Sequence, residues 1–434
     1  MNKRTTRFAM GGAVATAAII GLTGCGVGGG ADDTGSAAAD GEITGDIVFQ
    51  TWNLKGGYED YFTSLIAEFE KENPGTHIEW KDQPAEGYQA SLSADAAAGN
   101  LPDVVDMGPE AAYSLADAGI ALDITTVDED AQDLYLPKAW EAMTFKGLGG
   151  GTYGFPWYLN TGPQFFNTEL FEKCGLDPED LPTTEDELFE QAAIMGKNCD
   201  DVSMYGRLPA IENFGAYGVQ LMNDDETEFT FNEPRGVEYL QKYIDLYKGA
   251  GLNEDSIGAL QTGEVDAFKK GDIASIGGSS YTMKDLRETA PQIYDNVAVT
   301  PAIATEAPNM YIESLVVNSQ SKNTATAIAF AEYVTNVENQ TEFAKSASVF
   351  PSAAGALDDP FFTENDGSDD ALVRSISAGQ LDKAVVWWPP AFAGESSAEY
   401  FRDQIGQAVL GKKTAQEALD DAVAYANERI ALSE

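Results

Sequence analysis

The chain has 434 residues, 43% of them hydrophobic, and its 71 acidic against 26 basic residues give a formal net charge of −45. It is about three times as long as a typical domain, so two or more lobes are expected, and a peptide or a disulfide-stapled miniprotein is excluded. Such an acidic surface repels phosphate backbones and anionic lipids, which argues against nucleic-acid binding and polybasic membrane docking. We interpret the charge as a source of solubility.

The first 24 residues have the pattern of a secretion signal. Three basic residues among the first seven precede an apolar run, residues 8–21, that is too short to span a bilayer but suits a signal peptide. The sequence Leu-Thr-Gly-Cys at residues 22–25 resembles the lipobox of bacterial lipoproteins, in which the cysteine is acylated and becomes the mature N-terminus. This resemblance implies an extracytoplasmic protein anchored to the cell membrane through Cys25, with residues 25–42 as a flexible linker. The alternative is a signal peptide cut elsewhere.

From residue 43 onward, predicted strands alternate with predicted helices. Apolar patterning predicts strands at 46–52, 77–80 and 104–107, and helices at 58–72, at 87–98 and from Pro109. This order predicts an α/β fold with a parallel or mixed sheet and helices on both faces. Such sheets bind ligands at the carboxyl ends of their strands.

Two cysteines remain after Cys25. Cys174 and Cys199 lie in or beside helices predicted at about 168–174 and 184–197. In an oxidising compartment they can form a disulfide if the two helices are neighbours. Two buried thiols are the alternative, and the sequence leaves both open.

Several short motifs follow one another along the chain. They are Trp-Asn at 52–53, Ala-Glu-Phe-Glu-Lys-Glu-Asn-Pro-Gly at 67–75, Ala-Ala-Gly-Asn-Leu-Pro-Asp-Val-Val at 97–105 and Leu-Ala-Asp-Ala-Gly at 115–119, with further segments at 153–158, 165–167, 268–281, 321–334 and 411–419. In this order they resemble the extracellular solute-binding proteins of bacterial ABC importers, and most of all the sugar-binding branch that includes maltose- and oligosaccharide-binding proteins. The resemblance covers roughly residues 43–432.

The resemblance implies a fold like that of periplasmic binding proteins, with two α/β lobes joined by a multi-strand hinge around a ligand cleft. It places the N-terminal lobe at 43–157 plus 302–345 and the C-terminal lobe at 158–301 plus 346–434. The implied function is capture of an oligosaccharide outside the membrane by lobe closure and its delivery to the transmembrane subunits of an ABC permease. No bond is made or broken, no metal or cofactor is implied, and the protein is expected to act as a monomer.

A sugar site needs flat aromatic rings and paired polar groups, because sugars present CH faces and hydroxyls. The candidates that follow, largely from the resemblance, are Trp52, Asn53 and Lys55 after the first strand, Glu110 at a helix start, Trp157 and Tyr158 at the hinge, Ser279, Ser280 and Tyr281, and Trp387 and Trp388. Phe214, Tyr217, Glu212, Glu313 and Glu395 are weaker candidates, for which packing or a surface position is the alternative.

Each of these candidates has an alternative interpretation. Lys55 can be a solvated loop lysine, and Glu110 an acid favoured by the helix dipole. Because side chains alternate along a strand, only one of Trp157 and Tyr158 is expected to face the cleft. Two prolines follow Trp388 and place both tryptophans in a loop, where at least one is expected to stack on sugar.

Enzymatic functions have little support in the sequence. His77 is the only histidine, so multi-histidine metal sites are impossible, and no Gly-x-Ser-x-Gly elbow is present. A secreted glycosidase stays as an alternative because carboxylates are abundant. The other alternative keeps the fold and changes the solute to a peptide, an amino acid or a polyol. The lack of an arginine in the predicted cleft segments argues weakly against an anionic solute.

Overall fold

The structure is a computed structural model that describes residues 41–128, 130–258, 261–392 and 395–433. The predicted signal peptide, the lipobox with Cys25 and all but the last two residues of the predicted linker lie outside these ranges. Within them, no helix is both long enough and apolar enough to cross a membrane.

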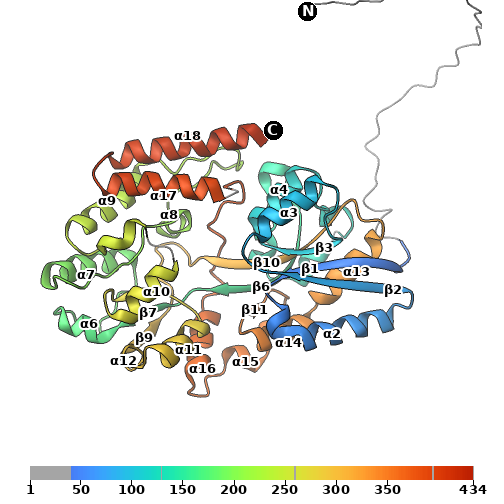
Figure 1. Ribbon diagram of the computed structural model, residues 1–434, viewed down its shortest axis with the longest axis horizontal. Helices are drawn as coiled ribbons and strands as arrows, with labels where there is room; N and C mark the ends of the chain where they lie inside the picture. The colour runs from blue at the N-terminus through green and yellow to red at the C-terminus, as the bar shows by residue number, and fades with distance from the viewer. Residues whose placement is uncertain (1–40, 129, 259–260, 393–394, 434) are drawn as a thin grey trace, which may run out of the picture. The chain divides into compact units, whose positions relative to one another are not determined.

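One lobe is built on a six-stranded mixed sheet with the strand order β11-β6-β10-β3-β1-β2 (Figure 1). β1 is parallel to β2 and β3, whereas β10 is antiparallel to β3 and β6. The strands are β1 (Gly45–Trp52), β2 (Thr76–Gln83), β3 (Val104–Met107), β6 (Phe155–Thr161), β10 (Met310–Val317) and β11 (Phe350–Pro351), and a separate pair is formed by β4 (Thr144–Phe145) and β5 (Gly151–Thr152). The bounds of β1, β2 and β3 confirm the three strands predicted before residue 110.

Helices cover both faces of this sheet. Phe49 of β1 packs against Phe62 and Phe330 on one face, while Val105 of β3 belongs to the core on the other face. The predicted helices are confirmed within three residues at each end, because the Pro-Gly and Pro signals in the sequence stop and start them as expected. The helices are α2 (Lys55–Glu72), α3 (Tyr88–Ala97), α4 (Pro109–Asp117), α5 (Pro137–Ala142), α13 (Thr324–Val334), α14 (Val337–Ala347) and α15 (Pro360–Thr363).

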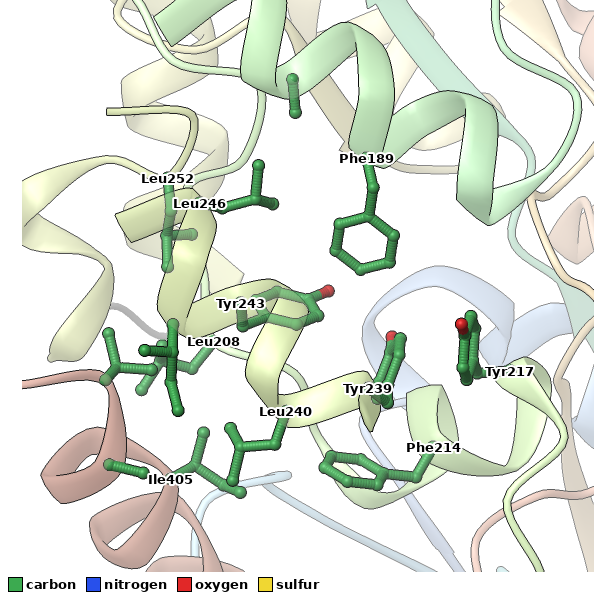
Figure 2. Packing of buried hydrophobic residues seen from close by; sticks show 14 of the residues in the cluster. Phe189, Leu208, Phe214, Tyr217, Tyr239, Leu240, Tyr243, Leu246, Leu252 and Ile405 are labelled. Atoms are coloured by element: carbon green, nitrogen blue, oxygen red, sulfur yellow. The ribbon is translucent and has the colours of Figure 1, made fainter. Parts of the chain in front are cut away.

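The other lobe has a three-stranded antiparallel sheet, with β7 (Gln164–Asn167) between β8 (Ser275–Gly277) and β9 (Val297–Thr300). Its largest core is rich in aromatic side chains, among them Phe189, Tyr239 and Tyr243 (Figure 2). The surrounding helices are α6 (Thr168–Lys173), α7 (Glu185–Asn198), α8 (Ile211–Tyr217), α9 (Pro234–Lys248), α10 (Gln261–Lys270), α11 (Ser280–Thr289), α12 (Pro291–Tyr294), α16 (Asp369–Ala378), α17 (Glu395–Val409) and α18 (Ala415–Ser433).

A disulfide joins Cys174 to Cys199, with 5.6 Å between their Cα atoms. Cys174 follows the last residue of α6, and Cys199 follows the last residue of α7. The side-chain amide of Asn198 also donates to the backbone carbonyl of Cys174, at 2.8 Å. The two predicted helices are therefore neighbours, and of the two readings left open by the sequence the disulfide is the one observed.

The chain passes between the sheets at places that differ from the predicted boundaries. β6 continues to Thr161 within the six-stranded sheet, so the first crossing is at residues 162–163 rather than at 157–158. The second crossing is the segment 301–309 between β9 and β10. After residue 345, Phe350 and Phe362 still share a core with Leu159 of β6, so the larger sheet's core extends past the predicted limit.

Candidate ligand-binding cleft

A cavity of about 470 Å³ is lined by both segments that connect the two sheets. Asn160 and Gln164 contribute from the first crossing, and Asn309 and Tyr311 from the second. The remaining lining comes from the smaller lobe and includes Tyr205, Arg207, Glu212, Asn213, Tyr243, Glu264, Ser275, Ser279 and Thr282. A ligand in this cavity would touch both lobes at the place where the chain crosses between them.

The loop before α8 holds the polar residues of the cavity in position. The Asn213 side chain accepts a hydrogen bond from the Ala210 N–H at 2.8 Å and so caps α8. Gly206 is required for close packing, because a Cβ there would lie 2.7 Å from Cδ1 of Ile273. Gln164 of β7 donates to the Ser275 hydroxyl on the neighbouring strand. Donors and acceptors are thus fixed before a ligand arrives.

Three charged side chains line the cavity. Arg207 and Glu264 form an ion pair, with 3.3 Å between Nε and Oε2. Glu212 is only 8% exposed, and its Oε2 has no hydrogen-bond partner among the described residues. Burial raises the pKa of the Glu212 carboxyl, as does the nearby Glu110 of the other lobe, whereas Arg207 lowers it. The lining therefore includes a carboxyl group whose own backbone N–H also lowers its pKa, and of which one oxygen has no partner among the described residues.

A second group of carboxyls lies in the larger lobe, at the ends of β3 and β10. Asp106 is fully buried, and neither of its carboxyl oxygens has a hydrogen-bond partner among the described residues. Burial, together with Glu313, raises the pKa of Asp106 well above its usual range. Burial and the neighbouring Glu110 raise the pKa of Glu313 to about 8, and the side chain of Trp52 partly offsets this rise. These acids are harder to ionise than ordinary carboxyls because they are desolvated together.

The family of bacterial extracellular solute-binding proteins matches residues 55–341. The chain belongs to this family. Among its relatives is the sn-glycerol-3-phosphate-binding periplasmic protein UgpB of Escherichia coli K12, which is 26% identical over 410 residues that cover 87% of this chain and 90% of UgpB.

Solved structures share the fold of this solute-binding protein. A periplasmic-binding protein of Synechococcus sp. MITs9220, whose suggested ligand is an oligosaccharide, is 24% identical with a TM-score of 0.78 and covers 89% of this chain and 99% of its own. The GacH receptor of Streptomyces glaucescens GLA.O, solved without ligand and with acarbose, is 21% identical with a TM-score of 0.67 and covers 90% of this chain and 99% of its own. The predicted two-lobe fold of periplasmic binding proteins is confirmed.

The two loop tryptophans of the solute-binding protein lie in different surroundings. Trp387 lines a second cavity, of about 590 Å³, together with residues of both lobes such as Lys146 and Glu226. Its indole N–H donates to the carbonyl of Ala307 at 2.8 Å, so the ring is fixed beside the second crossing. Trp388 lines a smaller cavity of about 180 Å³ and packs edge-on against Phe392.

Predicted residues of the larger lobe gather around the carboxyl group at β3 and β10. A Cβ at Gly108 would lie 2.9 Å from Oε2 of Glu110 and 3.9 Å from Oε1 of Glu313, so these two acids face the same turn. Trp52 is half-buried beside Tyr88, and Asn53 has a positive φ of 54° in the loop that follows. Lys55 starts α2, where its ammonium group lies 3.9 Å from Glu59 and over the Trp80 ring.

Two predicted ligand residues are corrected by the structure. Trp157 is fully buried and packs against Phe343 in the core of the larger lobe. Phe214 is fully buried on α8, where its ring meets Tyr239 edge-on (Figure 2). Trp157 belonged to a pair of which only one was expected to face the cleft, and Phe214 was a weaker candidate. Neither exposes a surface for a solute. Tyr158, the neighbour of Trp157, is half-buried and pairs with Glu313 across β6 and β10.

The predicted residues of the Gly-Gly segment are separated. Ser279 lines both the 470 Å³ cavity and a separate small pocket, whereas Ser280 lines only the small pocket. Tyr281 is 77% exposed on α11 and lies outside the described lining of either cleft cavity. Glu395 begins α17, but its side chain lies outside the part of the chain that is described.

Sequence reasoning missed the residues on which the cavity depends most. The argument that the cleft segments lack an arginine is wrong, because Arg207 lines the cavity. Its partner Glu264 comes from α10, so no spacing in the sequence connects the two. Tyr311 had a signal in the sequence, because it stands between two apolar residues of a strand and alternation turns it away from the side they bury; it is 57% exposed.

Proposed function

We propose that this chain is the substrate-binding lipoprotein of a bacterial ABC transporter, which captures an oligosaccharide outside the membrane by lobe closure and delivers it to the permease. The observation that carries the proposal is the lining of the 470 Å³ cavity, which combines three tyrosines with amide and hydroxyl side chains. Aromatic faces match the CH faces of sugars, and the polar groups match their hydroxyls. Membership of the solute-binding family supports the capture role.

The ligands of the relatives divide between sugars and a phosphate ester. UgpB is named for sn-glycerol 3-phosphate, and the GacH receptor was solved with acarbose. A phosphate needs a surplus of positive charge or free N–H donors. In this cavity, Arg207 is engaged by Glu264 and Glu212 adds another acid, so the lining favours a sugar over a phosphate ester.

The proposal has two further parts: the protein binds its solute without catalysis, and it carries a lipid anchor. The matched family is one of binding proteins, which supports the absence of catalysis. The sequence at residues 22–25 supports acylation of Cys25 as the membrane anchor. A peptide, amino acid or polyol as solute and a glycosidase activity are the alternatives that the experiment must separate.

The test is a calorimetric titration of the full-length protein, purified in a detergent without a sugar headgroup. The ligands are neutral and amino di- to tetrasaccharides, monosaccharides, amino acids, polyols and short peptides. An oligosaccharide is expected to bind and to be recovered uncut by chromatography. Binding of only a peptide, amino acid or polyol contradicts the solute class, and cleaved products contradict the absence of catalysis.

Two exposed tyrosines provide a matched pair of variants. Tyr311→Ala removes the aromatic face inside the cavity and is expected to weaken the affinity for the bound oligosaccharide about tenfold, or ~1.4 kcal/mol. Tyr281→Ala removes an even more exposed ring outside the cavity lining and is expected to leave the affinity unchanged. Equal losses in the two variants would place the ligand elsewhere.

A further inference from the structure

The charges that line the 470 Å³ cavity do not cancel. Apart from tyrosines, its ionisable lining residues within the described part of the chain are Arg207, Glu212 and Glu264. Arg207 and Glu264 form an ion pair and so satisfy each other. Glu212 is left as one acid without a basic partner in contact.

Glu212 is also short of a hydrogen-bond donor. Its side chain is 8% exposed, and its Oε2 has no partner among the described residues. A buried carboxylate without a donor costs several kcal/mol or takes up a proton instead. The carboxyl group is therefore short of one donor, and a ligand group in the cavity that reaches Glu212 is expected to supply it.

The electrostatic surroundings decide which ligand group suits the position. Glu110, from the other lobe, raises the pKa of Glu212 but lies outside the described lining of this cavity. Two carboxyls of the lining, Glu212 and Glu264, act on a single guanidinium, that of Arg207. A hydroxyl can donate to Glu212, but it leaves the excess negative charge uncompensated, whereas an ammonium group removes it.

We propose that the solute carries a basic nitrogen, as an amino sugar does, and that its ammonium group pairs with the carboxylate of Glu212. This inference rests on the proposed sugar-binding function and names a class of sugar within it. An anionic sugar phosphate is disfavoured by the same two acids. N-acetylation of the amine removes its charge and is expected to remove the preference.

Proton release follows from the same geometry. Because burial and Glu110 raise the pKa of Glu212, the empty protein keeps a proton there to a higher pH than an ordinary glutamate does. An ammonium group beside it lowers that pKa again, so binding expels the proton. The heat of binding should then depend on the ionisation enthalpy of the buffer, while a neutral sugar at the same site should show little such dependence.

The experiment titrates full-length protein, in the detergent named above, with three sets of sugars that differ only at one position. Glucosamine, N-acetylglucosamine and glucose are compared, each as the monosaccharide and as the β-1,4-linked disaccharide, with sn-glycerol 3-phosphate as the anion. The amines are expected to bind at least tenfold more tightly than their neutral counterparts. A phosphate ester or a neutral sugar that binds as tightly as the amines overturns the inference, and so does failure of every amine to bind.

Two variants separate the role of Glu212 from a general effect of charge. Glu212→Gln keeps the size of the side chain and is expected to reduce the amine preference to less than about twofold. Glu238→Gln changes the net charge equally at an exposed position of α9 and is expected to keep the preference. If Glu212→Gln does not fold, the buffer dependence of the native protein decides, because its absence on binding an amine contradicts the inference.

Failure of this inference differs from failure of the proposed function. Tight binding of neutral oligosaccharides alone leaves the proposed function intact and removes the basic nitrogen. Binding of only amino acids or peptides contradicts the sugar class itself, and with it the inference.

Discussion

Glu185 should make the protein less stable as the pH rises through the neutral range. Its side chain is 7% exposed at the first position of α7, and burial raises the pKa of its carboxyl to about 8 from the ordinary 4.5. The hydroxyls of Tyr239 and Thr305 donate to its two oxygens at 3.4 and 3.2 Å, which only partly offsets this rise. Between pH 4.5 and 8 the folded state thus binds more protons at this site than the unfolded state does.

The sign and size of the effect follow from that difference. Stability contributed at this site is fully present below pH 4.5 and is lost as the pH rises toward 8, because unfolding then releases the proton. Relative to low pH, this carboxyl lowers the free energy of unfolding by about 1 kcal/mol at pH 5 and by about 3 kcal/mol at pH 7. Glu185→Gln removes the titrating group, so the variant's stability relative to the native protein should increase by about 2 kcal/mol between these two pH values.

The assay is urea unfolding followed by circular dichroism at pH 5, 6, 7 and 8. Many other acids contribute to the pH dependence of both proteins, but their contributions cancel in the difference between variant and native protein. Glu190→Gln, an exposed acid on the same helix, is the matched control and should give a difference that does not vary with pH. A constant difference for Glu185→Gln as well would refute the reasoning, since the carboxyl would then titrate as an exposed group does.

Two further predictions concern packing. Replacing both Cys174 and Cys199 by serine opens a 25-residue loop in the unfolded chain and should lower the free energy of unfolding by about 3 kcal/mol, measured by urea unfolding. An unchanged free energy of unfolding would mean that the disulfide does not stabilise the ends of α6 and α7. Gly215→Ala places a Cβ 2.6 Å from Cε3 of Trp387, so it should lower the free energy of unfolding by about 1–3 kcal/mol and weaken ligand binding. The control Gly57→Ala, with no atom within 4 Å of its Cβ, should leave the stability unchanged or slightly higher.

The order and type of the elements could be predicted because they depend on neighbouring residues. The Pro-Gly pair after residue 73 ends α2, and Pro109 occupies the first turn of α4, as their backbone preferences require. The lobe boundaries were less accurate. β6 continues four residues beyond the predicted limit because its pairing with β10 depends on a strand that lies far away along the chain.

The candidate site was less predictable, for two physical reasons. Alternation along β6 predicted that only one of Trp157 and Tyr158 faces the cleft, without saying which. Helices cover both faces of this sheet, so the choice depends on tertiary packing, and Trp157 is the residue in the core. Arg207 and Glu264 come from a loop and a helix with no shared motif, and only the folded chain brings them to 3.3 Å. The family resemblance supplied Glu110 and Glu313, which do face one turn.

The charge of the chain has two separate consequences, which the sequence alone could not distinguish. Most of the acids lie on the surface, where their field attracts cations but is screened over about 8 Å at physiological salt. Glu212 and Glu264 are buried at the cavity, where ions of the solvent screen them far less. Added salt should therefore slow the association of a cationic solute without removing its preference over a neutral one. Discrimination between solutes thus depends on a few buried carboxyls rather than on the net charge of −45.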